Sequence, residues 1–166
     1  MNKPLRTSIF VALLVSISVV LRIMISFIPN FQPVTAMVIL VTLFIGTKYG
    51  LIFSYLSIIA SNVYLGMGPW TLSQIVSYSV VVLFVSMFMK MDASPFKLSV
   101  LAFTSSILYG ISISVITVYI FNISNFWVYY GQGIWFDISH GVSSMVFIVV
   151  LLPVFKLTLE KVIEKS

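Results

Sequence analysis

The sequence has no cysteine, a single histidine and few charges, and each scarcity removes a class of function. Without cysteine, neither disulfides nor thiolate metal sites can form among the 166 residues. Asp, Glu, Lys and Arg make up 8% of the chain, whereas a soluble domain carries about 25%. So few charges cannot cover a water-facing surface. A soluble globular protein is therefore excluded, and there is no room for a soluble catalytic or nucleotide-binding domain.

What the sequence does contain is apolar: 60% of its residues are hydrophobic and the mean hydropathy is +1.16. A membrane-spanning helix needs about 20 predominantly apolar residues. The apolar stretches therefore predict an all-α integral membrane protein with six transmembrane helices, forming a single domain over residues 1–166. The predicted helices cover residues 5–28, 34–46, 49–65, 70–89, 96–121 and 132–157. The first stretch has no signal-peptide cleavage site and is expected to be retained, and Pro153 predicts a kink in the last.

Basic residues are distributed asymmetrically between the predicted loops. With six spans, one side collects eight of the nine Lys and Arg residues, namely Lys3, Arg6, Lys48, Lys90, Lys97, Lys156, Lys161 and Lys165. The loops of the other side, at 29–33, 66–69 and 122–131, carry none. Because cytoplasmic loops are enriched in Lys and Arg, both termini are predicted to be cytoplasmic. The net charge of +5 then reflects membrane topology and does not indicate a nucleic-acid partner.

The opposite, outer side is rich in aromatic and amide side chains. All three tryptophans, Trp70, Trp127 and Trp135, fall on this side, interleaved with amides such as Asn30 and Gln32. Aromatic belts of this kind occur at the interfaces of many membrane proteins. The same mixture also suits a lid over an organic ligand decorated with polar groups. Both interpretations remain open from the sequence.

Three ionisable side chains lie inside predicted spans on the outer half. Arg22 is six residues before the predicted end of the first helix and Asp137 is five residues into the last, so each is about 8–9 Å deep at 1.5 Å per residue. His140 follows one turn deeper. Charges at such depth normally face the bundle interior or a wet cavity. Opposite sign and matching depth predict that Arg22 and Asp137 are neighbours, which together with His140 either clamp helices or line a substrate cavity.

A second polar set flanks the turn at 66–69. Asn62 and Tyr64 precede it, and Trp70, Gln74 and Tyr78 follow at i, i+4 and i+8 on one helix face. Amides often join helices by hydrogen bonds, but an indole followed by amide and phenol groups also makes a graded wall for a ligand. The candidate substrate-binding residues are Arg22, Asn30, Gln32, Asn62, Tyr64, Trp70, Gln74, Tyr78, Trp135, Asp137 and His140.

Small residues recur every four positions on the first helix, at Ser8, Ala12 and Ser16. Such spacing makes a flat groove for close helix packing. The groove is expected either to pack within this bundle or to dock a second membrane protein.

An enzyme is not expected. Asp137 and His140, at i and i+3, supply only two metal ligands, and no further histidine is available. No serine has the sequence context of a nucleophile elbow. We therefore predict no catalytic residues, no metal site and no cofactor.

Three segments resemble the substrate-binding S components of energy-coupling factor (ECF) vitamin transporters. They are Asn-Phe-Gln-Pro-Val-Thr-Ala at 30–36, Ser-Asn at 61–62 leading to Gly-Met-Gly-Pro-Trp-Thr at 66–71, and Phe-Asp-Ile-Ser-His-Gly at 136–141. The resemblance implies a multi-pass protein of a bacterial plasma membrane that captures a vitamin outside. It also implies docking onto a transmembrane T component with two cytoplasmic ATPases. Ser8, Ala12 and Ser16 stand where many S components carry Ala-x-x-x-Ala for that contact.

The branch with these segments looks like the cobalamin-type S components, so cobalamin or a related cobamide is the first candidate ligand, with Arg22 able to meet its phosphate. Another vitamin or precursor remains an alternative. Two readings from other classes are also open. One is a non-transport membrane scaffold whose polar residues only lock helices, and the other is a self-sufficient proton-coupled carrier that uses Asp137 and His140 as its relay.

Overall fold

The computed structural model describes residues 2–91 and 94–164, with side chains as far as residue 162, and over these ranges the chain is helical with no strand. Lys165, which counts among the predicted cytoplasmic charges, lies outside the described residues. The helices are α1 (Lys3–Met24), α2 (Val34–Phe44), α3 (Thr47–Leu65), α4 (Pro69–Ser86), α5 (Pro95–Ile120) and α6 (Phe126–Leu159), followed by a π-helical turn, η1 (Glu160–Glu164). The predicted all-α fold is confirmed.

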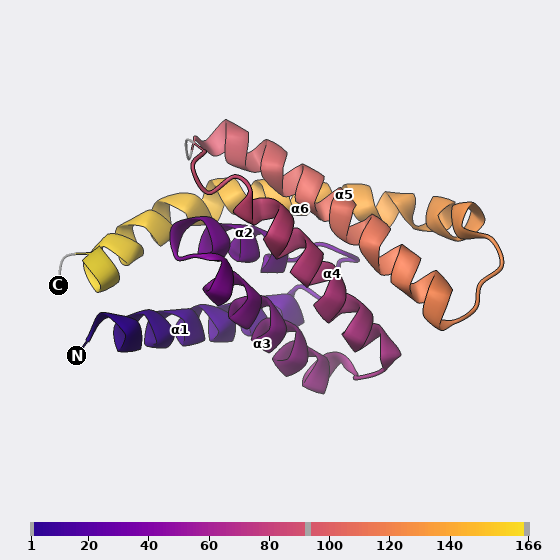
Figure 1. Ribbon diagram of the computed structural model, residues 1–166, viewed down its shortest axis with the longest axis horizontal. Coiled ribbons are helices and arrows are strands. Elements are labelled where there is room, and N and C mark those ends of the chain that lie inside the picture. Colours follow the sequence, from indigo (N-terminus) through magenta and orange to yellow (C-terminus); the bar gives the residue numbers. More distant parts are fainter. Residues whose placement is uncertain (1, 92–93, 165–166) are drawn as a thin grey trace.

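The helices run back and forth along one axis (Figure 1). Both termini lie at the left end of that view, together with the end of α2, the start of α3, the end of α4 and the start of α5. The α3–α4 and α5–α6 connections lie at the other end. Helix α1 packs on α3, α4 packs between α3 and α5, and α5 runs along α6.

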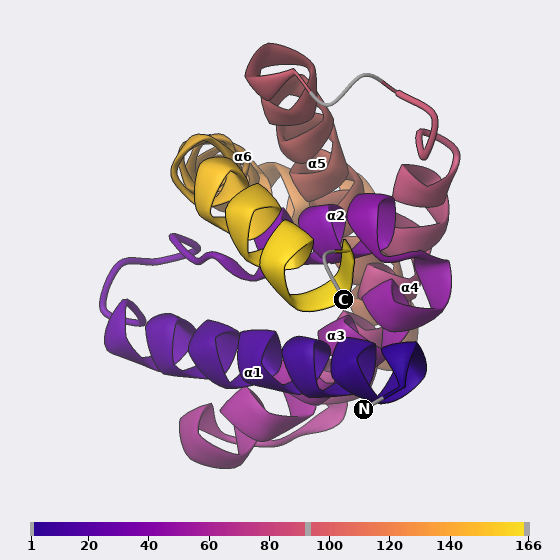
Figure 2. The same ribbon diagram turned by 90° about the vertical axis from the view of Figure 1, so that its left-hand side faces the viewer.

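Helix α2 is the centre of the bundle, as Figure 2 shows from the end that carries the termini. It contacts each of the other five α-helices, and every residue from Val34 to Thr42 is buried. A helix that is apolar all round is a core helix. With 11 residues it is about 16 Å long, too short to cross the roughly 30 Å of a hydrocarbon core.

The remaining helices place apolar side chains outside and hydroxyl groups inside. Large apolar residues such as Leu13, Val63, Phe96 and Val149 are exposed on the outer faces. Many serines are buried instead, at positions 18, 54, 57, 61, 73, 77, 99, 105, 106, 143 and 144. Four helices, α1, α4, α5 and α6, are long and apolar enough to cross a membrane, whereas α2 and α3 do not meet both requirements. This distribution is that of a membrane-spanning protein and not of a soluble one.

The predicted boundaries that differ most from the structure are the end of the first helix and the start of the last, both at the end of the molecule away from the termini. Helix α1 ends at Met24 and not at residue 28, because residues 25–28 form turns with hydrogen bonds back to Leu21, Ile23 and Ile25. Helix α6 begins at Phe126 and not at residue 132. There the Asn125 side chain accepts a hydrogen bond of 3.1 Å from the Val128 amide and caps the helix. The predicted 122–131 loop is therefore mostly helix. Pro153 lies inside α6, which bends toward its C-terminal end in Figure 1.

Helices α5 and α6 are in close contact at Gly110. A Cβ atom built on Gly110 would lie 2.1 Å from the carboxyl group of Asp137, far inside van der Waals contact. The missing side chain of Gly110 thus makes the space that the Asp137 carboxyl occupies. Gly141 has a similar role, because a Cβ there would lie 2.5 Å from the Phe103 ring.

We predict that Gly110→Ala destabilises the protein by about 1–3 kcal/mol, the usual cost of overpacking a filled interior, as measured by thermal unfolding in detergent. Gly131→Ala, in α6, is the matched control, because a Cβ there meets nothing within 4 Å. Replacing an exposed helical glycine with alanine should stabilise by about 0.5–1 kcal/mol. Equal shifts for the two variants would contradict the close approach at Gly110.

Candidate functional site

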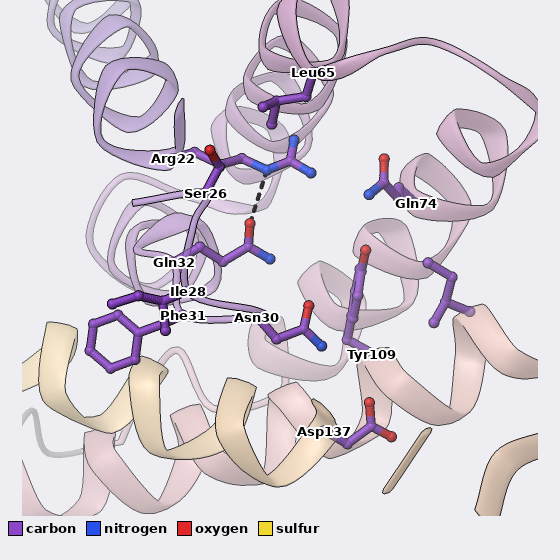
Figure 3. A pocket seen from close by; sticks show the side chains of 11 residues that line it. Arg22, Ser26, Ile28, Asn30, Phe31, Gln32, Leu65, Gln74, Tyr109 and Asp137 are labelled. Atoms are coloured by element: carbon purple, nitrogen blue, oxygen red, sulfur yellow. Dashed lines mark hydrogen bonds between the residues drawn. The ribbon is translucent and has the colours of Figure 1, made fainter. Parts of the chain in front are cut away.

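A cavity of about 270 Å³ opens between the last turn of α1, the α1–α2 connection (residues 25–33), the end of α3 and the facing parts of α4, α5 and α6 (Figure 3). Its polar lining comes from five of these six parts, so no single element forms the site. The lining residues are Arg22, Ser26, Ile28, Asn30, Phe31, Gln32, Leu65, Gln74, Tyr109, Ile113 and Asp137.

Arg22 is the cation of this cavity and is held by neutral acceptors. Its side chain is 8% exposed. Nε donates to Oε1 of Gln32 at 2.9 Å, and Nη1 donates to Oδ1 of Asn62 at 3.2 Å and to the hydroxyl of Ser61. Because these partners carry no charge, they satisfy hydrogen-bond donors without neutralising the guanidinium. The positive charge stays available to the cavity.

Asn62 extends this network from α3 to α4. Its Nδ2 donates to Oγ1 of Thr71 at 2.9 Å and to Oε1 of Gln74 at 2.7 Å. The orientation of the Asn62 amide follows from Arg22, since a guanidinium can only donate and must meet the amide oxygen. The hydrogen bonds of Asn62 therefore join the end of α1 to α3 and α4.

The α1–α2 connection is fixed against α6. Oγ of Ser143 accepts from the backbone N–H of Gln32 at 2.8 Å and donates to the backbone carbonyl of Gln32 at 3.2 Å. Nδ2 of Asn30 donates to the Phe136 carbonyl at 3.1 Å, and Oγ of Ser139 donates to the Pro29 carbonyl at 3.2 Å. Asn30 has φ of 55°, a left-handed conformation that asparagine tolerates better than most residues. This tether holds Asn30 and Gln32 over the cavity.

Asp137 is on the opposite wall, and it does not pair with Arg22 as the sequence predicted. It is 8% exposed and interacts with the phenol of Tyr130, while the charged group of Arg22 is occupied by its neutral partners. The pairing was predicted from equal distances to two helix ends, and both ends lie elsewhere in the structure. Arg22 is two residues before the end of α1, and Asp137 is eleven residues after the start of α6. The two groups face one cavity without forming an ion pair.

His140 and Tyr78 lie beneath the cavity and do not line it. Oγ1 of Thr35, on α2, is 2.7 Å from Nε2 of His140 and 3.0 Å from the hydroxyl of Tyr78. The ring of Tyr109 packs against both, with centroids 5.3 Å from His140 and 4.6 Å from Tyr78. Tyr109 thus separates a hydrogen-bonded polar core from the cavity.

Five of the eleven residues predicted to bind substrate line the cavity: Arg22, Asn30, Gln32, Gln74 and Asp137. Asn62 does not line the cavity but bonds to Arg22 and Gln74, which do. Tyr78 and His140 are buried beneath the cavity floor. Tyr64, Trp70 and Trp135 are exposed by 74%, 48% and 75% and take no part in the lining. Their exposed rings, like that of Trp127, agree with an aromatic belt.

Sequence reasoning missed Tyr109, which forms one wall of the cavity. Its ring lies on α5, where the prediction singled out no polar residue. A phenol in an otherwise apolar span requires a hydrogen-bond partner, and that requirement was the available signal. In the structure its hydroxyl interacts with Gln74. Ser26, Ile28, Phe31, Leu65 and Ile113 were also missed as lining residues.

The small-residue stripe of α1 is on the outside of the molecule. Ser8, Ala12 and Ser16 are all exposed, so the stripe does not pack within this bundle. The hydroxyls of Ser8 and Ser16 bond to carbonyls of their own helix, at Pro4 and Ala12, which keeps this face free of unsatisfied polar groups.

The chemistry that this arrangement supports is binding. Among the described residues, no three His, Asp or Glu side chains come together in a way that could hold a metal ion. Comparison with known proteins adds no relative, because no protein-family model, no curated protein and no solved structure matches this chain. The geometry of the cavity therefore carries the functional argument.

We predict that Asn62→Ala lowers the free energy of unfolding by about 1.5–3 kcal/mol, the range for hydrogen bonds that involve a charged group. The substitution leaves one N–H of Arg22 Nη1 and the Oε1 of Gln74 without partners, while the Ser61 hydroxyl still accepts from Nη1. Thermal unfolding measures the effect, with Tyr64→Phe as the control, since Tyr64 is close in sequence but exposed. An Asn62→Ala variant as stable as that control would contradict the role of Asn62 in the network.

A second prediction concerns the pair that does not form. Because Arg22 and Asp137 share no hydrogen-bond partner, Arg22→Gln and Asp137→Asn should destabilise additively, with a coupling energy below about 0.5 kcal/mol in a double-mutant cycle. A buried ion pair would instead leave one charge uncompensated in each single variant and restore stability in the double variant. Such recovery would show that the two groups pair after all.

Proposed function

We propose that this chain is the substrate-binding S component of an ECF-type vitamin importer. The observation that carries the proposal is the cavity itself, because an apolar helical bundle keeps a buried guanidinium and a buried carboxyl group facing one space without pairing them. A scaffold gains nothing from such an arrangement, since charges in a bilayer are costly unless they pair or serve a function. The sequence segments that resemble S components contribute Asn30, Gln32, Asn62 and Asp137 to this site or its support.

The proposed topology crosses the membrane six times with both termini in the cytoplasm, and the short, buried α2 makes the second passage together with the α1–α2 connection. Two observations support it. The helix ends alternate between the two ends of the molecule (Figure 1), and the basic residues of the described chain other than Arg22 gather at the helix ends next to the termini. The cavity is next to the opposite ends, at the last turn of α1 and the last residue of α3. In this topology it opens toward the outside, where an importer captures its substrate.

The size of the cavity bears on the choice of vitamin. At about 270 Å³ it is slightly below the range of about 300–1,000 Å³ typical of small-molecule sites. Cobalamin, the first candidate from the sequence, is a corrin with a nucleotide loop and far exceeds this volume. In the proposal it binds only if the α1–α2 connection opens, whereas a smaller vitamin or precursor fits the cavity as it stands.

We predict that the purified protein binds at least one member of a vitamin panel that includes cobalamin and smaller heteroaromatic vitamins and precursors. Isothermal titration calorimetry measures this binding directly. Asp137→Asn and Gln74→Leu should each weaken it by about tenfold or more, the cost of one hydrogen bond to a charged or buried group, and Tyr119→Phe on the exposed surface of α5 should not. Failure of the whole panel to bind would favour a scaffold. Uptake in cells that lack the ATPases, driven by a proton gradient, would favour a self-sufficient carrier.

The exposed stripe of α1 is the proposed docking face for the T component. We predict that Ala12→Trp abolishes co-purification of the T component and its two ATPases but leaves ligand binding by the isolated chain unchanged. The stripe and the cavity are at opposite ends of α1, and an indole at Ala12 removes the flat surface that a second helix needs. Ile17→Trp is the control, because Ile17 is exposed and lies five residues from Ala12, about 140° around the helix. An Ala12→Trp variant that still assembles would contradict this assignment.

A further inference from the structure

Hydrogen bonds behind the cavity decide which atoms face its interior. Arg22 uses Nε and Nη1 for Gln32, Ser61 and Asn62, which leaves both N–H groups of Nη2 without a hydrogen bond to any described residue. Gln32 gives its oxygen to Arg22 and keeps its Nε2 donor free for a ligand. The guanidinium, which has no acceptor, therefore sets the polarity of its neighbour.

Asn62 fixes the orientation of the Gln74 side chain in the same way. Asn62 turns its oxygen to Arg22 and its Nδ2 to Oε1 of Gln74. Gln74 is then left with Nε2, which interacts with the Tyr109 hydroxyl and has a second N–H for a ligand. Arg22, Gln32 and Gln74 thus form one wall of the cavity that presents N–H donors, and we call these three residues the donor wall.

The wall on the α6 side has the opposite character. Nδ2 of Asn30 is used by the Phe136 carbonyl, which can only accept, so Oδ1 of Asn30 remains as an acceptor. Asp137 adds a carboxyl group whose interaction with the Tyr130 phenol leaves further acceptor capacity. Asn30 and Asp137 are the acceptor wall. Figure 3 shows both walls around one space, with the ring of Tyr109 between Gln74 and Asp137.

We propose that the cavity binds a small dipolar molecule that carries an anionic group at one end and a cationic or amino group at the other. The anionic group meets the donor wall, the amino group meets the acceptor wall, and a flat central portion lies on Tyr109. This inference deepens the proposed function and rests on it for the identity of the site. A ligand with only one charged end would leave the opposite wall desolvated and without partners, which lowers its affinity.

The experiment compares matched probes on the purified full-length protein by thermal stabilisation. At a fixed probe concentration, the stabilisation increases as the Kd of the probe decreases. The aromatic set is 4-(aminomethyl)benzoate, 4-methylbenzoate and 4-methylbenzylamine, and the shorter set is 4-aminobutanoate, butanoate and butylamine. We expect at least one of the two dipolar probes to bind about tenfold more tightly than either of its singly charged relatives, since each relative lacks one charged hydrogen-bonding end. The absence of this advantage in both sets, including the absence of any stabilisation, overturns the inference.

Gln74→Glu tests the donor wall with little change in shape. A glutamate keeps the oxygen that accepts from Asn62 but replaces the Nε2 donor with a second acceptor. It should therefore weaken the anionic probes about tenfold while it retains the cationic ones. Asp137→Asn should do the reverse, and Tyr119→Phe should leave all six affinities unchanged. A Gln74→Glu variant that binds the probes like the unaltered protein overturns the donor wall.

These outcomes are separable from failure of the proposed function. If a vitamin binds and the T component co-purifies but the dipolar probes have no advantage, the function stands and the dipolar ligand class is wrong. If the dipolar probes bind best and the T component is never captured, the ligand class stands and the importer assignment is wrong.

Discussion

The guanidinium of Arg22 is the group on which the organisation of the cavity end of this protein depends. It is buried, it can only donate, and the structure surrounds it with neutral acceptors from the α1–α2 connection and from α3. Each acceptor is an amide or a hydroxyl with a second polar end, so the direction of the first hydrogen bond is passed on to the next residue. One cation thereby orients Gln32, Asn62 and Gln74 and ties three helices together.

A cavity persists next to this network because the surrounding elements cannot close it. Helix α2 fills the centre of the bundle but begins only at Val34, so the space beyond its start is covered by the α1–α2 connection. That connection is hydrogen-bonded to α6 through Ser139 and Ser143, which holds it in place without letting it fill the space below. In a bilayer, irregular backbone of this kind is tolerated only where it is buried in protein or lines a polar space.

The aromatic residues show how far composition alone can mislead about a site. Tryptophans and amides are mixed along the outer segments of the sequence, and both classes were candidates for ligand binding. The structure separates them: the amides turn inward to Arg22 and α6, whereas Trp70 and Trp135 stay on the surface. An indole gains from the interface between lipid and water, but a buried amide gains only where its partners are. Periodicity cannot distinguish these cases, because it does not indicate which face of a helix has neighbours.

By itself the sequence determined that the protein is an all-helical bundle with several membrane-spanning helices, because hydrophobic length and scarcity of charge leave no other stable arrangement. It also identified most of the polar groups that matter, since a charge or an amide inside an apolar span needs a reason to be there. Only the tertiary structure decided which of them meet. The ends of α1 and α6 differ from the predicted ones, and each hydrogen bond of Arg22 depends on side chains brought together from other parts of the chain. Which polar groups pair depends on the distances between helices. Those distances follow from packing around α2 and at Gly110, and the local sequence pattern does not indicate how helices pack.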